Sequence, residues 1–122
     1  MTPAFKPLTQ GSNAATVALT AAAATYYTVP SSPDNTITHV RGLILCNTDT
    51  AQRTVRIHNV ASGGAVAASN AIFYDLTIAA KTTVKVCFDE GHWVLTAGMT
   101  IQALADSASV VTITLCGQEV AP

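Results

Sequence analysis

The feature that most constrains this chain is an alternation of apolar and polar residues with a period of two, which recurs from residue 17 to residue 120. Successive side chains of an extended strand point to opposite faces, so this period predicts strands with one buried face. Turn-forming residues separate about eight such segments at intervals of roughly 8–12 residues. The pattern predicts an all-β fold, a single antiparallel β-sandwich of about eight strands that is jelly-roll-like.

Three segments need a choice between structures. Residues 16–25, "TVALTAAAAT", contain alanines that favour helix, but the flanking Thr and Tyr residues favour strand and turn. Gly42 lies inside a long predicted strand, which is typical of a bulge or bend. Residues 95–115 predict a terminal hairpin. The alternation predicts a core that contains Val55, Ile57, Ile72, Leu76, Val84, Val86, Ile101, Ile113 and Leu115.

Residues 1–13 are predicted to form an extended N-terminal arm, and residues 14–122 to form the sandwich domain. Two prolines exclude helix from the arm, and a Gly-Ser-Asn cluster ends it. Because the arm carries Phe5 and Leu8, we expect it to contact another chain, and its removal to leave the melting temperature nearly unchanged. The alternatives are a free tail and an arm folded over its own sandwich.

The low charge of the chain bears on its partners. Charged residues make up 11% and the net charge is −1, whereas an ordinary soluble domain is about a quarter charged. Such a surface has little repulsion against self-association, so we expect a homo-oligomer. There is no basic patch for nucleic acid and no apolar run of the roughly 18–20 residues that a membrane helix needs. The N-terminus lacks the apolar region of a signal peptide, which indicates assembly in the cytoplasm.

Few residues indicate chemistry. The segment "DEGHW" (89–93) has two carboxylates and a histidine that could bind a divalent metal, but a solvated turn fits it better. "SGG" (62–64) lacks the spacing of a phosphate loop, and Asp75 is expected to pair with Lys85 on the next strand. Cys46, Cys87 and Cys116 are expected to be reduced, buried and unbridged. We therefore expect no enzymatic activity, no cofactor and no bound metal.

Two histidines lie on predicted strands, and we expect His39 and His58 to lie at the surface or at an interface. His58 shares a face with Arg56, so these two residues join Phe5 and Leu8 as candidate assembly contacts. An aromatic platform for a sugar is the alternative kind of site. It would use Tyr26, Tyr27, Phe73, Tyr74 and Trp93.

Three stretches carry a family resemblance: "TYYTVPSSPDNTITHVRGLILCNTDTAQRTVRIHNV" (25–60), "NAIFYDLTIAAKTTVKV" (70–86) and "WVLTAGMTIQALADSASVVTITLCGQEV" (93–120). Together they resemble a group of small all-β structural proteins encoded by tailed bacteriophages. Met99 departs from the group, which usually has an Asp at this turn. The same leucine-glycine-acid turn also occurs in trimeric jelly-roll heads of the tumour-necrosis-factor and complement type.

The resemblance implies a structural protein of the virion, assembled in the host cytoplasm. A capsid decoration (cement) subunit that contacts neighbouring subunits is the first expectation, with the major capsid protein or other virion proteins as partners. A tail, collar or fibre component with a carbohydrate- or receptor-binding role is the alternative. The group supplies no catalytic residues that match positions in this chain.

Overall fold

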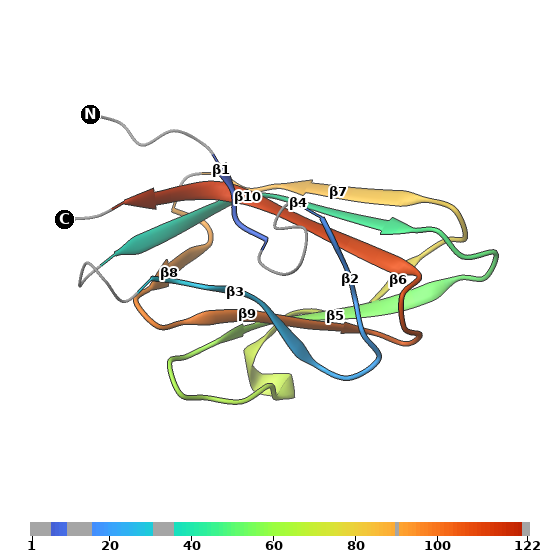
Figure 1. The fold of residues 1–122 in the computed structure, drawn as a ribbon, viewed down its shortest axis with the longest axis horizontal. Coiled ribbons are helices and arrows are strands. Elements are labelled where there is room, and N and C mark those ends of the chain that lie inside the picture. The colour runs from blue at the N-terminus through green and yellow to red at the C-terminus, as the bar shows by residue number, and fades with distance from the viewer. Residues whose placement is uncertain (1–5, 10–15, 31–35, 90, 121–122) are drawn as a thin grey trace.

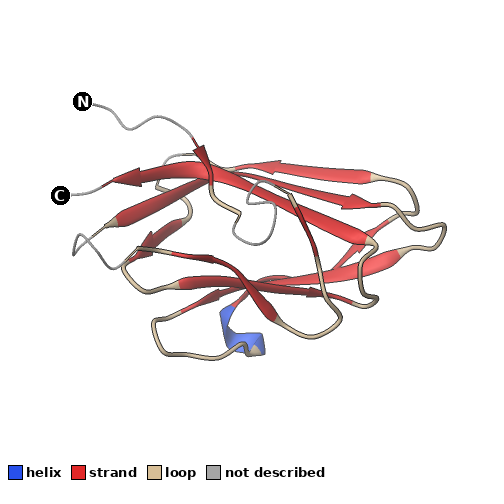
Figure 2. Ribbon diagram, viewed as in Figure 1, coloured by secondary structure: helices blue, strands red, loops and turns tan. Residues whose placement is uncertain are grey.

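Two antiparallel β-sheets face each other across one apolar core (Figure 1). The computed structural model describes residues 6–9, 16–30, 36–89 and 91–120. Strands make up most of this part of the chain, and a single turn of 3-10 helix lies in one loop (Figure 2). The predicted all-β sandwich is confirmed, and the described residues contain ten strands in place of about eight. Its jelly-roll character stays a prediction.

One sheet has six strands and the other has four. In the six-stranded sheet, β1 (Lys6–Pro7), β10 (Val111–Val120), β4 (Ile37–Asn47) and β7 (Thr83–Cys87) follow one another, while β2 (Val17–Ala18) pairs with β10 and β8 (Val94–Thr96) pairs with β4. The four-stranded sheet has the order β3 (Ala24–Thr28), β9 (Thr100–Ala105), β5 (Arg53–Val60) and β6 (Ala71–Ile78). The helical turn η1 (Ala68–Asn70) precedes β6.

The segment 95–115 does not form the predicted hairpin. β9 pairs with β3 and β5, whereas β10 pairs with β4, β1 and β2 in the opposite sheet. The connection 106–109 therefore crosses from one sheet to the other. Both strands bury their apolar residues in the same interior, so their alternation is identical in a hairpin and in a crossover. The prediction of strand and turn for 16–25 is confirmed by β2 and β3.

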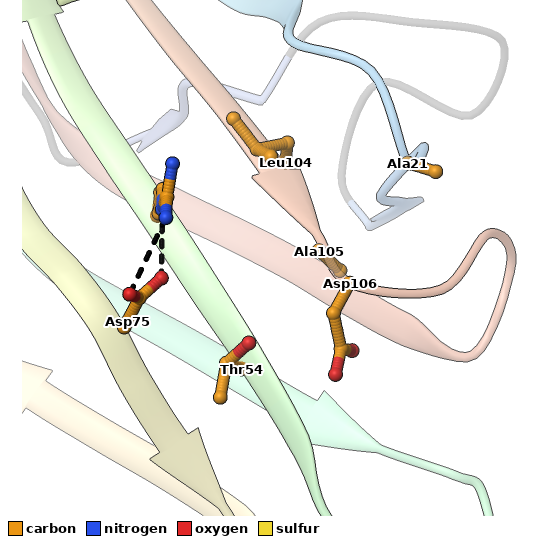
Figure 3. A pocket seen from close by; sticks show the side chains of 7 residues that line it. Ala21, Thr54, Asp75, Leu104, Ala105 and Asp106 are labelled. Carbon is orange, nitrogen blue, oxygen red and sulfur yellow. Dashed lines mark hydrogen bonds and ion pairs between the residues drawn. The ribbon is translucent and has the colours of Figure 1, made fainter.

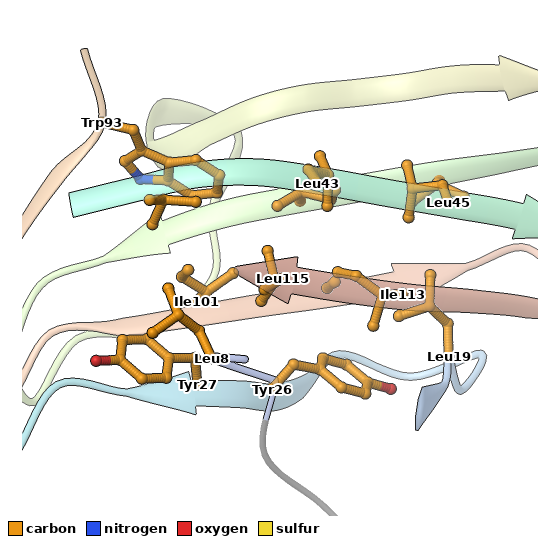
Figure 4. Close-up of a cluster of buried hydrophobic side chains, with 14 of the residues drawn as sticks. Leu8, Leu19, Tyr26, Tyr27, Leu43, Leu45, Trp93, Ile101, Ile113 and Leu115 are labelled. Atoms are coloured by element: carbon orange, nitrogen blue, oxygen red, sulfur yellow. The ribbon is translucent and has the colours of Figure 1, made fainter. Parts of the chain in front are cut away.

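The core lies between the sheets and contains most of the predicted side chains (Figure 4). Val55, Ile57, Ile101, Ile113 and Leu115 are fully buried. Three further predicted residues are only partly buried against this cluster, namely Leu76, Val84 and Val86. The prediction for Ile72 is wrong, because its side chain is exposed and Phe73 packs against the core instead.

A bulge in β6 explains the exposure of Ile72. Val55 pairs with Leu76 and Ile57 pairs with Phe73, so two steps along β5 match three steps along β6. The extra residue reverses the alternation of the strand. Asp75 adopts a positive φ of 57°, which Asp tolerates better than most residues. As a result, Phe73 and Leu76 face the core, and the residues at 72, 74 and 75 are exposed.

A second bulge confirms the prediction for Gly42. On β10, Cys116 pairs with Gly42 but the next residue, Gly117, pairs with Val40. Arg41 is therefore the extra residue of β4 at this point. The bulge keeps Val40 and Leu43 both buried although they are three residues apart.

The described part of the predicted arm belongs to the sandwich. Lys6 and Pro7 pair with β10, and the Leu8 amide donates to the carbonyl of Leu115 at 2.8 Å. The Leu8 side chain is 2% exposed and sits among core residues of both sheets (Figure 4). This corrects the expectation that Leu8 is free to contact another chain. Phe5 lies outside the described residues.

A polar cluster inside one end of the sandwich fixes this N-terminal segment. Glu119 accepts a hydrogen bond from the buried Tyr27 hydroxyl and forms an ion pair with Lys6 at 2.5 Å. Thr38 lies 2.7 Å from the same hydroxyl. Burial and the hydrogen bond to Glu119 raise the pKa of Tyr27. Burial opposes ionisation of Glu119, but the hydrogen bonds from Lys6 and Tyr27 outweigh it and lower its pKa.

Candidate functional site

The candidate site lies on the outer face of the four-stranded sheet, around Arg56 of β5. The Arg56 guanidinium donates two hydrogen bonds to Asp75, at 2.7 Å from Nε to Oδ1 and 3.3 Å from Nη2 to Oδ2. It also lies over the ring of Tyr74, 4.1 Å from the ring centre, which is a cation–π contact. The hydrogen bonds lower the pKa of Asp75 and raise that of Arg56. The β6 bulge creates this arrangement, because it brings Tyr74 and Asp75 together on the exposed side.

An open pocket of about 250 Å³ adjoins the ion pair. Thr54, Asp75 and Asp106 supply hydroxyl and carboxylate groups, and Leu104 supplies an apolar surface (Figure 3). Carboxylates accept hydrogen bonds, and the hydroxyl of Thr54 can donate or accept one. The pocket can therefore hold a small polar ligand that has hydroxyl groups and an apolar face.

His58 lies on the same outer face as Arg56, as predicted, but it is not at the surface. The ring is 3% exposed because the loop 61–70 covers it. Its Nδ1 lies 3.0 Å from the carbonyl of Ala67 and 2.8 Å from Oδ1 of Asn70. Both partners are acceptors here, so Nδ1 carries the proton and donates. The expectation that His58 lies at the surface is therefore wrong.

The predicted ion pair of Asp75 with Lys85 is wrong. Asp75 pairs with Arg56 instead, and Lys85 lies on β7 in the other sheet.

The five aromatic residues considered as a sugar-binding platform do not lie on one surface. A bulge in β3 turns Tyr26 and Tyr27 both inward, and Trp93 is buried edge-on against Phe88 with ring centres 5.2 Å apart. Among the five aromatic residues proposed for the platform, Tyr74 alone is exposed, at 52%.

In the segment 89–93, the described residues Asp89 and His92 are exposed, and the His92 amide donates to the Asp89 carbonyl at 3.0 Å. His92 Nδ1 lies 4.0 Å from Oδ2 of Asp89, and Gly91 has a positive φ of 86°. Within 6–9, 16–30, 36–89 and 91–120, no three His, Cys, Asp or Glu side chains gather as a metal site.

His39, expected at the surface or at an interface, is half-buried, and its Nδ1 is enclosed without a hydrogen-bond partner. The turn at 62–64 is closed by a 2.9 Å hydrogen bond from Gly64 to Ala61.

The three cysteines are unbridged but are not buried as expected. Cys46 is half-buried, whereas Cys87 and Cys116 are exposed on the outer face of the six-stranded sheet. Cys87 lies on β7 and Cys116 on β10, and these two strands flank β4. Cys46 follows the buried Leu45, and Cys116 follows the buried Leu115, so both cysteines point away from the core. Cys87 follows Val86, which packs against the core.

Sequence reasoning selected Arg56 but missed its two partners. The signal for them was the order Tyr-Asp-Leu in β6, where Asp75 interrupts two apolar residues that belong to different faces. Comparisons with family models, characterised proteins and solved structures found no match for this chain. No helix among the described residues is long and apolar enough to cross a membrane.

Proposed function

We propose that this chain is a non-enzymatic structural subunit of a tailed-bacteriophage particle, in the first place a capsid decoration subunit, and that it contacts neighbouring subunits through the outer face of the four-stranded sheet. The observation that carries the proposal is the outward display of Ile72 and Tyr74 beside Arg56. The partners are further copies of the chain, the major capsid protein or other virion proteins. Its place is then the virion.

The chemistry of this face supports a protein contact. Tyr and Arg are enriched at interfaces because each combines a large contact area with directed hydrogen bonds. Ile72 and Tyr74 are 37% and 52% exposed, so their apolar surface gains from being covered. The Arg56–Asp75 pair holds the Tyr74 ring from one side and reduces the entropy lost when a partner covers it.

The open edge of β6 supports the same conclusion. β6 pairs with β5 on one side and ends the sheet on the other. An edge strand offers unpaired backbone groups to another chain, while the bulge at Asp75 limits how far a foreign strand can pair. The segments "TYYTVP" and "GLILCNT" add the resemblance to phage structural proteins as a further argument.

A tail, collar or fibre role with carbohydrate binding is the second candidate. The pocket beside the ion pair favours it, because Asp75, Asp106 and Thr54 can bind hydroxyl groups while Leu104 contacts an apolar sugar face. A volume of about 250 Å³ is below the usual range of pockets for drug-sized ligands, about 300–1,000 Å³, and suits a single sugar ring.

The deciding experiment combines a density map of the intact particle with four variants. Ile72→Ser and Tyr74→Ala should reduce incorporation into particles. Ile44→Ser is the matched control, because Ile44 is 38% exposed on the other sheet and should leave incorporation unchanged. Absence of the chain from purified particles contradicts the proposal. Binding to a glycan array that is lost in Thr54→Val, with incorporation into a tail or fibre, favours the second candidate.

A further inference from the structure

Two exposed cysteines face each other across the middle of the six-stranded sheet. Cys87 of β7 and Cys116 of β10 both pair in register with Gly42 of β4. Residues paired in register on neighbouring strands project to the same face. Both thiols therefore stand on the outer face, and the residue between them has no side chain.

The sulfur of Cys116 lies over this glycine. A Cβ atom added to Gly42 would lie 2.7 Å from Cys116 Sγ, which is closer than real Cβ contacts. The Cys116 side chain thus occupies the space that any larger residue at position 42 would fill. One open groove of about 260 Å³ is lined by both cysteines and has Gly42 between them.

The spacing is too wide for a disulfide and suits one inserted atom. Neighbouring strands are about 4.8 Å apart, so the two Cα atoms are about 9.6 Å apart. A disulfide needs at most about 6.8 Å between Cα atoms. Two metal–sulfur bonds in line, at the zinc–thiolate length of about 2.3 Å, hold the sulfurs about 4.6 Å apart, whereas a disulfide holds them about 2.05 Å apart. The Cα–Cα distance that can be bridged then rises to about 9.4 Å, within about 0.2 Å of the spacing of the two cysteines.

The surrounding charges suit a thiolate complex. Thiolates prefer soft ions such as Cu(I). Two thiolates and one monovalent ion carry a net charge of −1. The groove is lined by Lys85 and Arg41, whose positive charges offset it.

From this geometry we propose that Cys87 and Cys116 form a two-sulfur binding site for a soft monovalent metal ion of the Cu(I) class. Each thiol releases its proton to solvent, two sulfur–metal bonds form, and no atom changes oxidation state. The metal site lies on the six-stranded sheet, whereas the proposed contact face belongs to the four-stranded sheet. The result of a metal-binding test is therefore independent of the function proposed above.

The test is an anaerobic titration of the full chain with Cu(I) in competition with a chromogenic chelator. We expect one ion per chain, release of two protons, and two sulfur ligands in X-ray absorption at the copper edge. Cys87→Ser and Cys116→Ser should each weaken binding by roughly 10²–10⁴-fold, because the second sulfur no longer binds intramolecularly. Cys46→Ser is the matched control and should bind as the unmodified chain does.

Gly42→Ala tests the geometry with all thiols retained. The new Cβ displaces the Cys116 sulfur, so affinity should fall while three thiols remain titratable in the denatured chain. If this variant does not fold, the serine variants still decide the question. Equal binding by all three serine variants, or independent binding of one ion per cysteine, overturns the proposal.

Discussion

Among the ion pairs of the described residues, Lys6–Glu119 and Arg56–Asp75 differ in what surrounds them. In Lys6–Glu119 the Lys6 side chain is 52% exposed, but the Glu119 side chain is only 17% exposed and also accepts a hydrogen bond from the buried Tyr27 hydroxyl. Arg56–Asp75 lies in solvent, with side chains 37% and 51% exposed. The first pair helps to satisfy a buried hydroxyl and holds an N-terminal strand on the sheet. The second shapes a surface.

The difference shows where stability and recognition reside in this molecule. Exposed ion pairs contribute little to the free energy of unfolding, because water and salt screen them. The value of Arg56–Asp75 lies in the orientation of Tyr74 and of the pocket. A buried hydroxyl that loses its partner is costly, so the region around Glu119 should dominate the stability.

The largest loss of stability is expected for Leu8→Ala, two residues after Lys6 of the Lys6–Glu119 pair. Leu8 is 2% exposed in the core, so the change should lower the free energy of unfolding by about 2–5 kcal/mol. Urea unfolding followed by tryptophan fluorescence measures it. Leu8→Met should cost less than about 1.5 kcal/mol, because it nearly conserves volume. An unchanged midpoint in Leu8→Ala would show that residues 6–9 do not dock on the sandwich.

Tyr27→Phe should have the next largest effect. It removes a hydroxyl that contacts both Glu119 and Thr38 and leaves their polar atoms underused, at a cost of about 1–3 kcal/mol. Tyr74→Phe is the matched control, because its hydroxyl belongs to an exposed side chain and should leave the urea midpoint unchanged. Equal midpoints for the two variants would remove the distinction between the sheltered and the exposed region.

Acid should weaken the sheltered region through Glu119. Its folded pKa lies below the ordinary value of 4.5, so its contribution is present above pH 4.5 and is lost as the pH falls through the folded pKa. The melting temperatures of the unmodified chain and of Glu119→Gln should therefore differ at neutral pH and converge in acid. A constant difference down to the lowest pH would show that Glu119 is not ionised in the folded chain.

Arg56→Ala should have the smallest effect on stability. Both partners are solvent-exposed, so the urea midpoint should change within error, although the Tyr74 ring loses its cation–π contact. Exchange of the Tyr74 hydroxyl proton, or quenching of Tyr74 fluorescence, should increase when the ring loses this contact. A loss of stability as large as that of Tyr27→Phe would mean that this pair also supports the core.

The period-two alternation was sufficient to predict the sandwich and most of its core, because burial on one face imposes the pattern directly. The bulge at Gly42 was also predictable, since glycine inside a strand has few other uses. The pairing partners of the strands were not predictable from the sequence. The segment 95–115 shows the reason: alternation records which face is buried and is silent on the neighbour across which a strand bonds.

The candidate site was predicted only in part. Arg56 was selected from its face, but the bulge at Asp75 depends on a register between β5 and β6 that no local pattern contains. His58 was placed on the correct face and assigned the wrong environment, because a covering loop leaves no mark in the strand itself. The docking of Leu8 depends on Leu115 of β10, a strand more than a hundred residues away.

The central position of β10 has a consequence for how the molecule is made. β1, β2 and β4 all bond to this strand, yet it is synthesised after all three, and Thr9 and Leu115 are 106 positions apart in the sequence. Until it emerges, β4 offers a bare edge and an uncovered row of leucines to any nearby chain. Pairings this distant in sequence also form slowly. From the strand order we therefore expect slow folding, with an edge of β4 open to misassembly until β10 pairs.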